Sequence, residues 1–215
     1  MLKRTLDILL SILGLVSLFW LFPLVAICIK LDSKGPVFYR GIRAGKAGKP
    51  FRIFKFRTMV PDAEQRGGAE TPADDPRITT AGAILRRYKI DELPQLMNVL
   101  LGDMSFVGPR PEVMEEVVLY DDEEKELLRV RPGITDWASI KFRQEGEILR
   151  GSSDPHRTYH EKIRPEKVRL GLSYVRNDIS VKTDLQIIFT TLREVYLNGN
   201  TTNVAGGPRQ RPVGH

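Results

Sequence analysis

The 215-residue chain has 41% hydrophobic and 28% charged residues, the composition of an ordinary folded protein, which excludes a disordered chain. Its formal net charge of +6 indicates an anionic partner, such as nucleic acid, a phosphorylated ligand or a lipid headgroup. The single cysteine, Cys28, excludes an internal disulfide framework and a zinc site built from thiolates.

The first feature along the chain is an apolar run over residues 8–29 that contains no charged residue. A helix of this length would reach about 33 Å, close to the thickness of the hydrocarbon core of a bilayer. The run is longer than the apolar region of a signal peptide, and no small-residue cleavage site follows it. We therefore predict a membrane segment and favour it over a cleaved signal.

Basic residues flank this run on both sides. Lys3 and Arg4 precede it, and between residues 30 and 57 lysines and arginines far outnumber the lone acid, Asp32. Because such residues favour the cytoplasmic side, a segment that enters and leaves on one face satisfies both ends. Pro23 would break the helix and so favours this helix-break-helix. A simple spanning helix that tolerates the proline remains an equal alternative.

Residues 35–59 predict two short strands around a glycine-rich, basic turn. The turn does not match a phosphate-binding P-loop, because Ala47 stands where Ser or Thr should follow Lys46. We interpret it as a hairpin with a basic rim.

The rest of the chain alternates polar loops with helical patterns. Together these patterns predict a compact α/β domain, mostly helical with a small sheet, over residues 37–198, between a membrane hairpin at 1–36 and a disordered tail at 199–215. The predicted segments of this domain are a loop at 61–80, helical patterns at 81–90 and 93–101, an acidic helix at 111–128, a turn at 131–137, a helix at 159–174 and an amphipathic helix at 181–197, which packs on the core or lies on the bilayer surface.

Asp91 and Glu92, followed by Leu93 and Pro94, form the strongest candidate for chemistry. Pro94 suits the first turn of a helix, which predicts Asp91 at the N-cap and both carboxylates at the positive end of the helix dipole. There Asp91 would be stabilised as an anion, poised to act as a nucleophile, and free N–H groups could hold a phosphate. An ordinary helix cap is the alternative for such a pair.

Arginines near this pair favour a phosphate substrate. Arg86 precedes the pair and Arg110 follows the predicted helix between two prolines. A planar guanidinium binds phosphate through two hydrogen bonds, and Mg²⁺ needs only one or two carboxylates beside substrate phosphates, so Glu92 could suffice. A structural salt-bridge network is the alternative.

At this point the sequence resembles a known family. The motifs KFRTM (55–59), DPRIT (75–79), the block at 85–111 and RPGIT (131–135) are similar to the signature of the bacterial sugar transferases, the monotopic polyprenyl-phosphate phosphoglycosyl transferases. The likeness runs from Lys3 to about residue 190. It implies transfer of a sugar-1-phosphate from a UDP-sugar to undecaprenyl phosphate, with release of UMP, at the cytoplasmic face of the bacterial inner membrane. The resemblance does not specify which sugar is transferred or which glycan pathway the product enters.

The resemblance also implies roles for individual residues. Asp91 would attack the sugar-linked phosphate to give a covalent phosphosugar-aspartyl enzyme, and Glu92 would help to bind Mg²⁺. Substrate phosphates would be held by Arg86, Arg110, Lys55, Arg57 and Arg131, while Pro23 would break the membrane helix and Lys3 and Arg4 would lie at the membrane interface. The implied partners are the two substrates and inner-membrane lipids, without nucleic acid; confinement to a membrane surface favours a homodimer.

The chain departs from the family pattern at two positions: Phe22 stands where Ser often precedes the membrane proline, and Asp136 stands where Gly is common. Elsewhere, His156 and His160 are spaced to share a helix face as metal ligands, but without an evident third ligand we favour a surface or packing role. For Asp103 we favour a turn or cap role over a metal site.

Two other functions are alternatives. The basic, aromatic segment from Phe38 to Phe56 could bind single-stranded nucleic acid by stacking, but this leaves the Asp91 and Glu92 pair unexplained. A scaffold that has lost transferase activity is disfavoured because this pair and Arg110 are intact.

Overall fold

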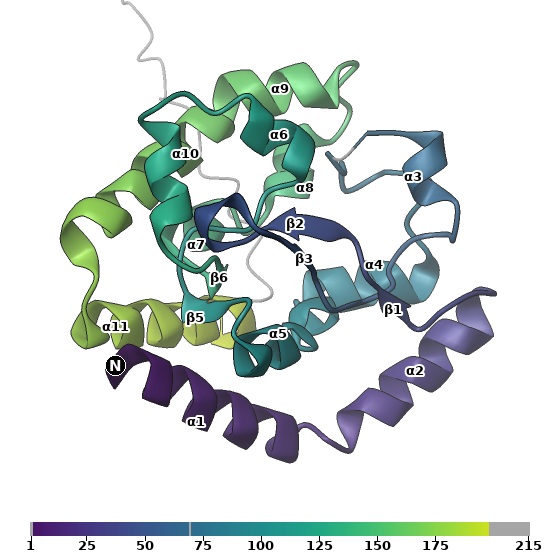
Figure 1. Ribbon diagram of the computed structural model, residues 1–215. Helices are drawn as coiled ribbons and strands as arrows, with labels where there is room; N and C mark the ends of the chain where they lie inside the picture. The colour runs from purple at the N-terminus through teal and green to yellow at the C-terminus, as the bar shows by residue number, and fades with distance from the viewer. Residues whose placement is uncertain (1, 69, 198–215) are drawn as a thin grey trace, which may run out of the picture.

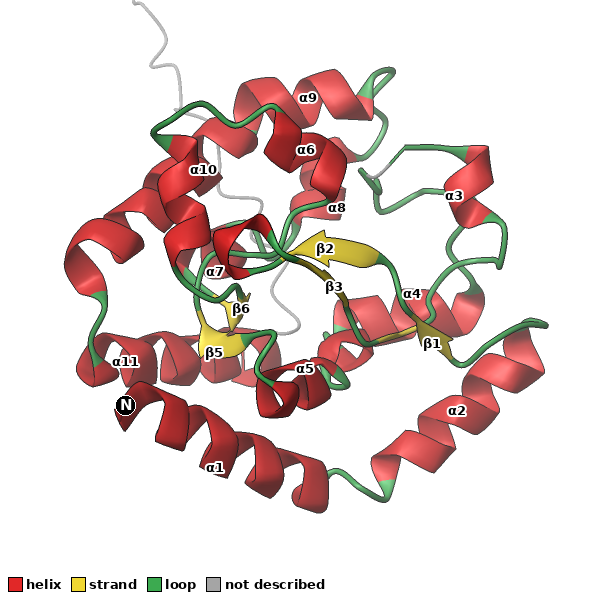
Figure 2. Cartoon of the chain, in the orientation of Figure 1, coloured by secondary structure: helices red, strands yellow, loops and turns green. Residues whose placement is uncertain are grey.

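The computed structural model describes residues 2–68 and 70–197. This part of the chain is mixed and mostly helical, with three small two-stranded sheets (Figure 2). The predicted combination of many helices with few strands is confirmed. The predicted disordered tail, 199–215, falls outside the described residues.

Two helices, α1 (Leu2–Ser17) and α2 (Leu21–Asp32), form an open V along one side of the molecule (Figure 1). No described helix is long and apolar enough to cross a bilayer alone, whereas α1 and α2 together meet that test but are bent by 65°. The break lies at residues 18–20, just before Pro23 and not at it. In the first turn of α2 the proline loses no hydrogen bond, while its ring would clash with a helix continuing from α1.

The polar side of α1 faces the protein and its apolar side faces outward. Asp7 and Ser11 are buried, whereas Leu13 and Val16 are 63% and 71% exposed. This is the reverse of a helix on the surface of a water-soluble domain, whose apolar stripe packs inward.

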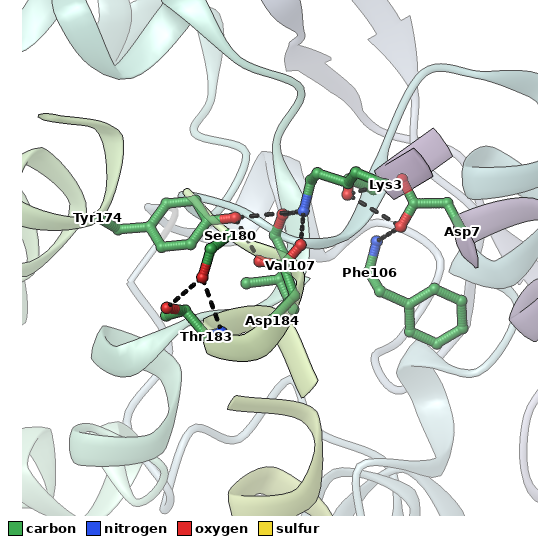
Figure 3. A network of polar contacts seen from close by, with 9 residues as sticks. Lys3, Asp7, Phe106, Val107, Tyr174, Ser180, Thr183 and Asp184 are labelled. Carbon is green, nitrogen blue, oxygen red and sulfur yellow. Dashed lines mark hydrogen bonds and ion pairs between the residues drawn. The ribbon is translucent and has the colours of Figure 1, made fainter. Parts of the chain in front are cut away.

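Lys3 joins α1 to α11 (Val181–Leu192) through a polar network (Figure 3). Its ammonium group lies 2.5 Å from the carboxylate of Asp184 and also donates to the carbonyl of Val107, at 3.0 Å, and the hydroxyl of Tyr174, at 3.2 Å. The Tyr174 hydroxyl in turn donates to Asp184, at 2.7 Å. Lys3 therefore serves to dock the first helix.

Two more side chains of α1 bind the same body. Arg4 donates to the carbonyls of Val99 and Leu100, and Asp7 accepts from the Phe106 N–H. Arg4, like Lys3, therefore has its cationic group on the protein, and their expected place at the membrane interface stays a prediction.

The strands are short. β2 (Ile42–Ala44) and β3 (Pro50–Arg52) form an antiparallel hairpin, which confirms the predicted strands around the basic turn. β1 (Phe38–Tyr39) pairs antiparallel with β4 (Lys55–Phe56).

The third sheet corrects the sequence analysis. The predicted turn at 131–137 contains a strand, β6 (Gly133–Thr135), which pairs in parallel with β5 (Ser105–Val107). A Cβ atom at Gly133 would lie 2.2 Å from the backbone nitrogen of Gly108, so only glycine permits this approach. Turn residues in the sequence thus mark a close strand contact.

The remaining helices surround these strands (Figure 1). A short helix lies in the predicted loop at 61–80, and the predicted helix at 159–174 is two helices that meet at Ile163. The α-helices between α2 and α11 are α3 (Ala63–Arg66), α4 (Thr80–Arg87), α5 (Gln95–Leu101), α6 (Met114–Val118), α7 (Trp137–Lys141), α8 (Glu145–Leu149), α9 (Pro155–Lys162) and α10 (Arg164–Ser173). A 3-10 helix lies at Glu124–Arg129.

The core is built from small apolar clusters between these elements. Ile53 packs with Val99 of α5 and Met104, all fully buried or nearly so. Ile187 of α11 is also buried, whereas Phe189 on the same helix is 71% exposed, so α11 packs on the core with one face only. The first of these clusters fixes α5 against the strand segment that carries Lys55.

Candidate active site

Asp91 and Glu92 lie in a 3-10 turn, Ile90–Glu92, which Lys89 enters in the left-handed conformation with φ 55°. The prediction that Asp91 caps the following helix is wrong, because α5 begins at Gln95. A cap at Asp91 would accept from the N–H of residue 93 or 94. The Leu93 N–H already bonds to the Ile90 carbonyl, and Pro94 has no N–H.

This turn opens onto a cleft of about 1050 Å³. Five of the residues predicted for the site line it, namely Lys55 from β4, Arg86 from α4, Asp91, Glu92 and Arg110. Segments far apart in the sequence thus bring three cations to two carboxylates.

Glu92 is held by two of these cations. Both terminal nitrogens of the Arg110 guanidinium donate to its carboxylate, and the Lys55 ammonium donates to Oε1 at 3.1 Å. Burial opposes ionisation of Glu92, but the charges of Arg110 and then Lys55 outweigh it and hold its pKa well below the usual range. The charge of Glu92 correspondingly raises the pKa of Arg110. The two cations therefore favour the ionised form of Glu92.

Asp91 is bound quite differently. Its side chain is buried, and within the described part of the chain no donor reaches its Oδ1. Burial and then the charge of Glu92 raise its pKa, against the opposing charges of Lys55, Lys89 and Arg86. The pair thus comprises one carboxylate fixed by cations and one with an acceptor oxygen available.

Arg86 reaches the cleft from the last turn of α4, whose first turn is capped by Thr79 accepting from the Gly82 N–H at 3.1 Å. Burial lowers the pKa of Arg86, and the charge of Asp91 partly offsets this effect. The guanidinium stays protonated, because the pKa of arginine lies far above neutrality. It therefore supplies a fixed positive charge near Asp91.

Two other arginines predicted for phosphate binding lie elsewhere among the described residues. Arg57 donates to the carbonyl of Pro36, at 2.6 Å, and to the hydroxyl and carbonyl of Ser33, which fastens the C-terminal end of α2. Arg131 donates to the carbonyl of Gly102 at 2.8 Å. Both side chains hold backbone carbonyls in place.

Sequence reasoning missed Asn98, which is fully buried in α5. Its side chain accepts from the Phe54 N–H at 2.7 Å and donates to the Arg52 carbonyl at 2.9 Å. These bonds join the segment before Lys55 to the helix after Asp91, so Asn98 sets the distance between the two. The signal in the sequence is a polar amide side chain, that of Asn98, among the apolar residues of the helical pattern at 93–101.

The two departures from the family pattern have structural roles. The ring of Phe22 packs edge-on against Phe56, with centroids 5.2 Å apart. Asp136 caps α7 by accepting from the Ser139 N–H at 2.6 Å, and burial raises its pKa. Asp136 also lines the cleft, together with Glu112, whose pKa is raised by burial.

Comparisons with known proteins find sugar phosphotransferases among the relatives of this chain. The chain is 41% identical over 202 residues to the undecaprenyl-phosphate glucose phosphotransferase of Komagataeibacter xylinus, which covers 90% of this chain and 36% of that protein. It is 36% identical over 196 residues to the UDP-N-acetylgalactosamine-undecaprenyl-phosphate N-acetylgalactosaminephosphotransferase of Aeromonas hydrophila, covering 90% of this chain and 43% of that protein.

The chain thus spans less than half the length of these two relatives. A shorter relative, the exopolysaccharide production protein ExoY of Sinorhizobium fredii, is 37% identical over 212 residues, which cover 91% of this chain and 86% of ExoY. The sequence model of the bacterial sugar transferases matches residues 1–198. The chain therefore belongs to the bacterial sugar transferase family.

Proposed function

We propose that this protein transfers a sugar-1-phosphate from a UDP-sugar to undecaprenyl phosphate and releases UMP. The names of its relatives support the substrate class, since two of them act on undecaprenyl phosphate. One observation carries the mechanism: Asp91 offers an oxygen without a hydrogen-bond donor among the described residues, in a cleft that Lys55, Arg86 and Arg110 make cationic.

In the proposed first step, the Asp91 carboxylate attacks the sugar-linked phosphorus. The bond from this phosphorus to the bridging oxygen breaks, and UMP leaves with the electron pair. In the second step, a phosphate oxygen of undecaprenyl phosphate attacks the same phosphorus, and the Asp91 carboxylate leaves. Both steps place negative charge on phosphoryl oxygens, which fixed cations stabilise.

Arg110 suits this task because it is already oriented. Glu92 takes hydrogen bonds from both of its terminal nitrogens, and a guanidinium has five N–H donors, so the remaining ones can bind a phosphate. Glu92 therefore acts as the positioning residue for Arg110 as well as for Lys55.

The carboxylate pair also fits Mg²⁺. The donors are oxygens, and Oε2 of Glu92 accepts from Arg110 only, which leaves it further acceptor capacity. A bound Mg²⁺ would supply positive charge, which stabilises a phosphate leaving group. Glu92 would hold the ion, and the diphosphate would supply the other ligands.

We further propose that residues 1–36 enter the cytoplasmic face of the inner membrane as a re-entrant hairpin, with residues 37–198 as the catalytic domain. The inverted polarity of α1 supports this, because its outward residues, such as Val16, are apolar and exposed. At the break Phe19 is 78% exposed, as expected for the deepest point of a hairpin. Lipid would cover these side chains.

The test of function is UMP release by the full chain in detergent, with Mg²⁺, undecaprenyl phosphate and a panel of UDP-sugars. Asp91→Asn should lower the rate by at least about 10³-fold. Asp122→Asn is the matched control, because this carboxylate is 99% exposed, and it should keep the wild-type rate. Wild-type turnover by Asp91→Asn would exclude Asp91 as the nucleophile.

The test of the hairpin is cysteine accessibility in closed membrane vesicles. In a Cys28→Ser background, Leu2→Cys and Lys34→Cys should both react with an impermeant thiol reagent from the same face. Reaction from opposite faces would show a spanning segment.

A further inference from the structure

Four metal-ligating side chains from separate segments converge outside the Asp91 and Glu92 pair. They are Glu70, which precedes α4, Glu116 of α6, and His156 and His160 of α9. Each offers one ligand atom, and these four atoms all lie within 4.8 Å of one another. The sequence showed only the histidine pair, because both acids are remote from it along the chain.

Two features of this cluster are compatible with a bound metal ion. The two imidazoles lie one helical turn apart with ring centroids 4.3 Å apart. The His160 Nε2 lies 3.3 Å from Oε1 of Glu116. Two ligand atoms of a tetrahedral metal ion, each about 2.0–2.1 Å from the ion, are expected to lie about 3.3 Å from each other. This nitrogen is out of contact with solvent and makes no hydrogen bond within the described residues. Its lone pair is therefore available to a cation.

The neighbouring charges leave one oxygen of Glu116 for a ligand. Arg164 lies 3.7 Å from Oε2 of Glu116, and its guanidinium makes two shorter hydrogen bonds, of 2.6 and 3.0 Å, to Glu124. Arg164 thus lies beside Oε2, while Oε1 faces His160. An outer partner of this kind orients a ligating carboxylate.

We propose that these four side chains bind a divalent transition metal ion, with Zn²⁺ as the best match. Two imidazole nitrogens and two carboxylate oxygens are a donor set for Zn²⁺, whereas Mg²⁺ and Ca²⁺ prefer oxygen ligands alone. The two carboxylates also balance the charge of the ion.

The position of the site indicates what the ion does. Glu70 and Glu116 both line the active-site cleft, and Glu70 belongs to the segment that joins α3 to α4. That segment has a further anchor, the hydrogen bond of 2.8 Å from the Ala73 N–H to the Gly146 carbonyl. The ion fastens this wall of the cleft to α6 and α9, as a structural clamp and not as a participant in transfer.

The test is metal binding by the untagged full chain in detergent, first stripped with a chelator. Zn²⁺ is titrated in competition with a chromophoric chelator, and Co²⁺ is substituted to record the visible absorption of a tetrahedral site. We expect one equivalent per chain and affinities at least about 10-fold weaker in His156→Ala and in His160→Ala. The control is His215→Ala, which removes the one other histidine of the sequence and should bind as wild type does.

The outcome that overturns the proposal is the absence of a stoichiometric ion, or an affinity unchanged in His156→Ala. His156 is exposed, so its loss does not threaten folding. Binding that is lost in Glu92→Gln but kept in both histidine variants would assign the ion to the catalytic pair and also refute the site. The clamp has its own readout: Zn²⁺ should slow amide hydrogen exchange at residues 70–73 in the wild type but not in His156→Ala, and unchanged exchange would refute the clamp.

Discussion

Neutralising either carboxyl group of the pair should change stability in opposite directions. The pKa of Asp91 is raised by burial, so its ionised form is disfavoured in the folded state, and Asp91→Asn should stabilise the protein at neutral pH. The pKa of Glu92 lies well below its usual range, so its ionised form contributes stability that is lost only as the pH falls through that value. Glu92→Gln should therefore destabilise the protein.

The size of these effects follows from the contacts. Removal of one partner from a buried ion pair costs about 3–5 kcal/mol, and we reduce this to about 2 kcal/mol because the Arg110 and Lys55 side chains are 29% and 21% exposed. For Asp91→Asn we expect a gain of about 1 kcal/mol. At about 2–4 °C per kcal/mol, Tm should fall by about 4–8 °C in Glu92→Gln and rise by about 2–4 °C in Asp91→Asn.

The assay is thermal unfolding of the wild type, Glu92→Gln and Asp91→Asn in one detergent at neutral pH, followed by tryptophan fluorescence. Glu147→Gln is the control, because its ion pair with Arg150 is about half exposed and its loss should change stability by less than about 0.5 kcal/mol. The reasoning is refuted if Glu92→Gln unfolds at the temperature of this control, or if Asp91→Asn is destabilised as much as Glu92→Gln.

Three further predictions concern the site and the docking of α1. Arg110→Lys loses the two-pronged contact with Glu92, so UMP release should fall at least about 10-fold; an unchanged rate would exclude phosphate binding by its guanidinium. Because transfer needs ionised Asp91, the rate should decline with acidification at a pH above the ordinary aspartate range, and a profile flat down to that range would contradict the raised pKa. Lys3→Met leaves the buried Asp184 without its cation and should lower the free energy of unfolding by about 1–2 kcal/mol, measured by thermal unfolding; an unaltered Tm would contradict this docking role.

Local signals in the sequence predicted most of the helices and the hairpin. Glycines marked the turn of the β2 and β3 hairpin, and apolar spacing marked α5. The strand β6 escaped prediction because its pairing depends on Gly133 meeting Gly108, a contact between remote segments that no local pattern encodes. A bend near Pro23 was one of two alternatives that the sequence left open, and the bend between α1 and α2 lies at residues 18–20, before the proline.

For the charged residues too, the sequence predicted the chemistry but not every contact. Residue type identified Arg86 and Arg110 as cations for a phosphate, and the structure brings both to the cleft. Arg57 and Arg131 have the same chemistry but bind backbone carbonyls, since an arginine takes whichever acceptors the fold brings near. The sequence thus predicts that a charge needs a partner, and only the fold selects that partner.

The most direct test of the central claim is intact-protein mass spectrometry after incubation with Mg²⁺ and a panel of UDP-sugars, without undecaprenyl phosphate. A covalent intermediate on Asp91 predicts a mass increase of one sugar phosphate with the correct donor, which disappears in Asp91→Asn and on addition of undecaprenyl phosphate. Release of UMP only after the lipid phosphate is added, with no adduct from any donor, would show direct displacement and contradict a nucleophilic Asp91.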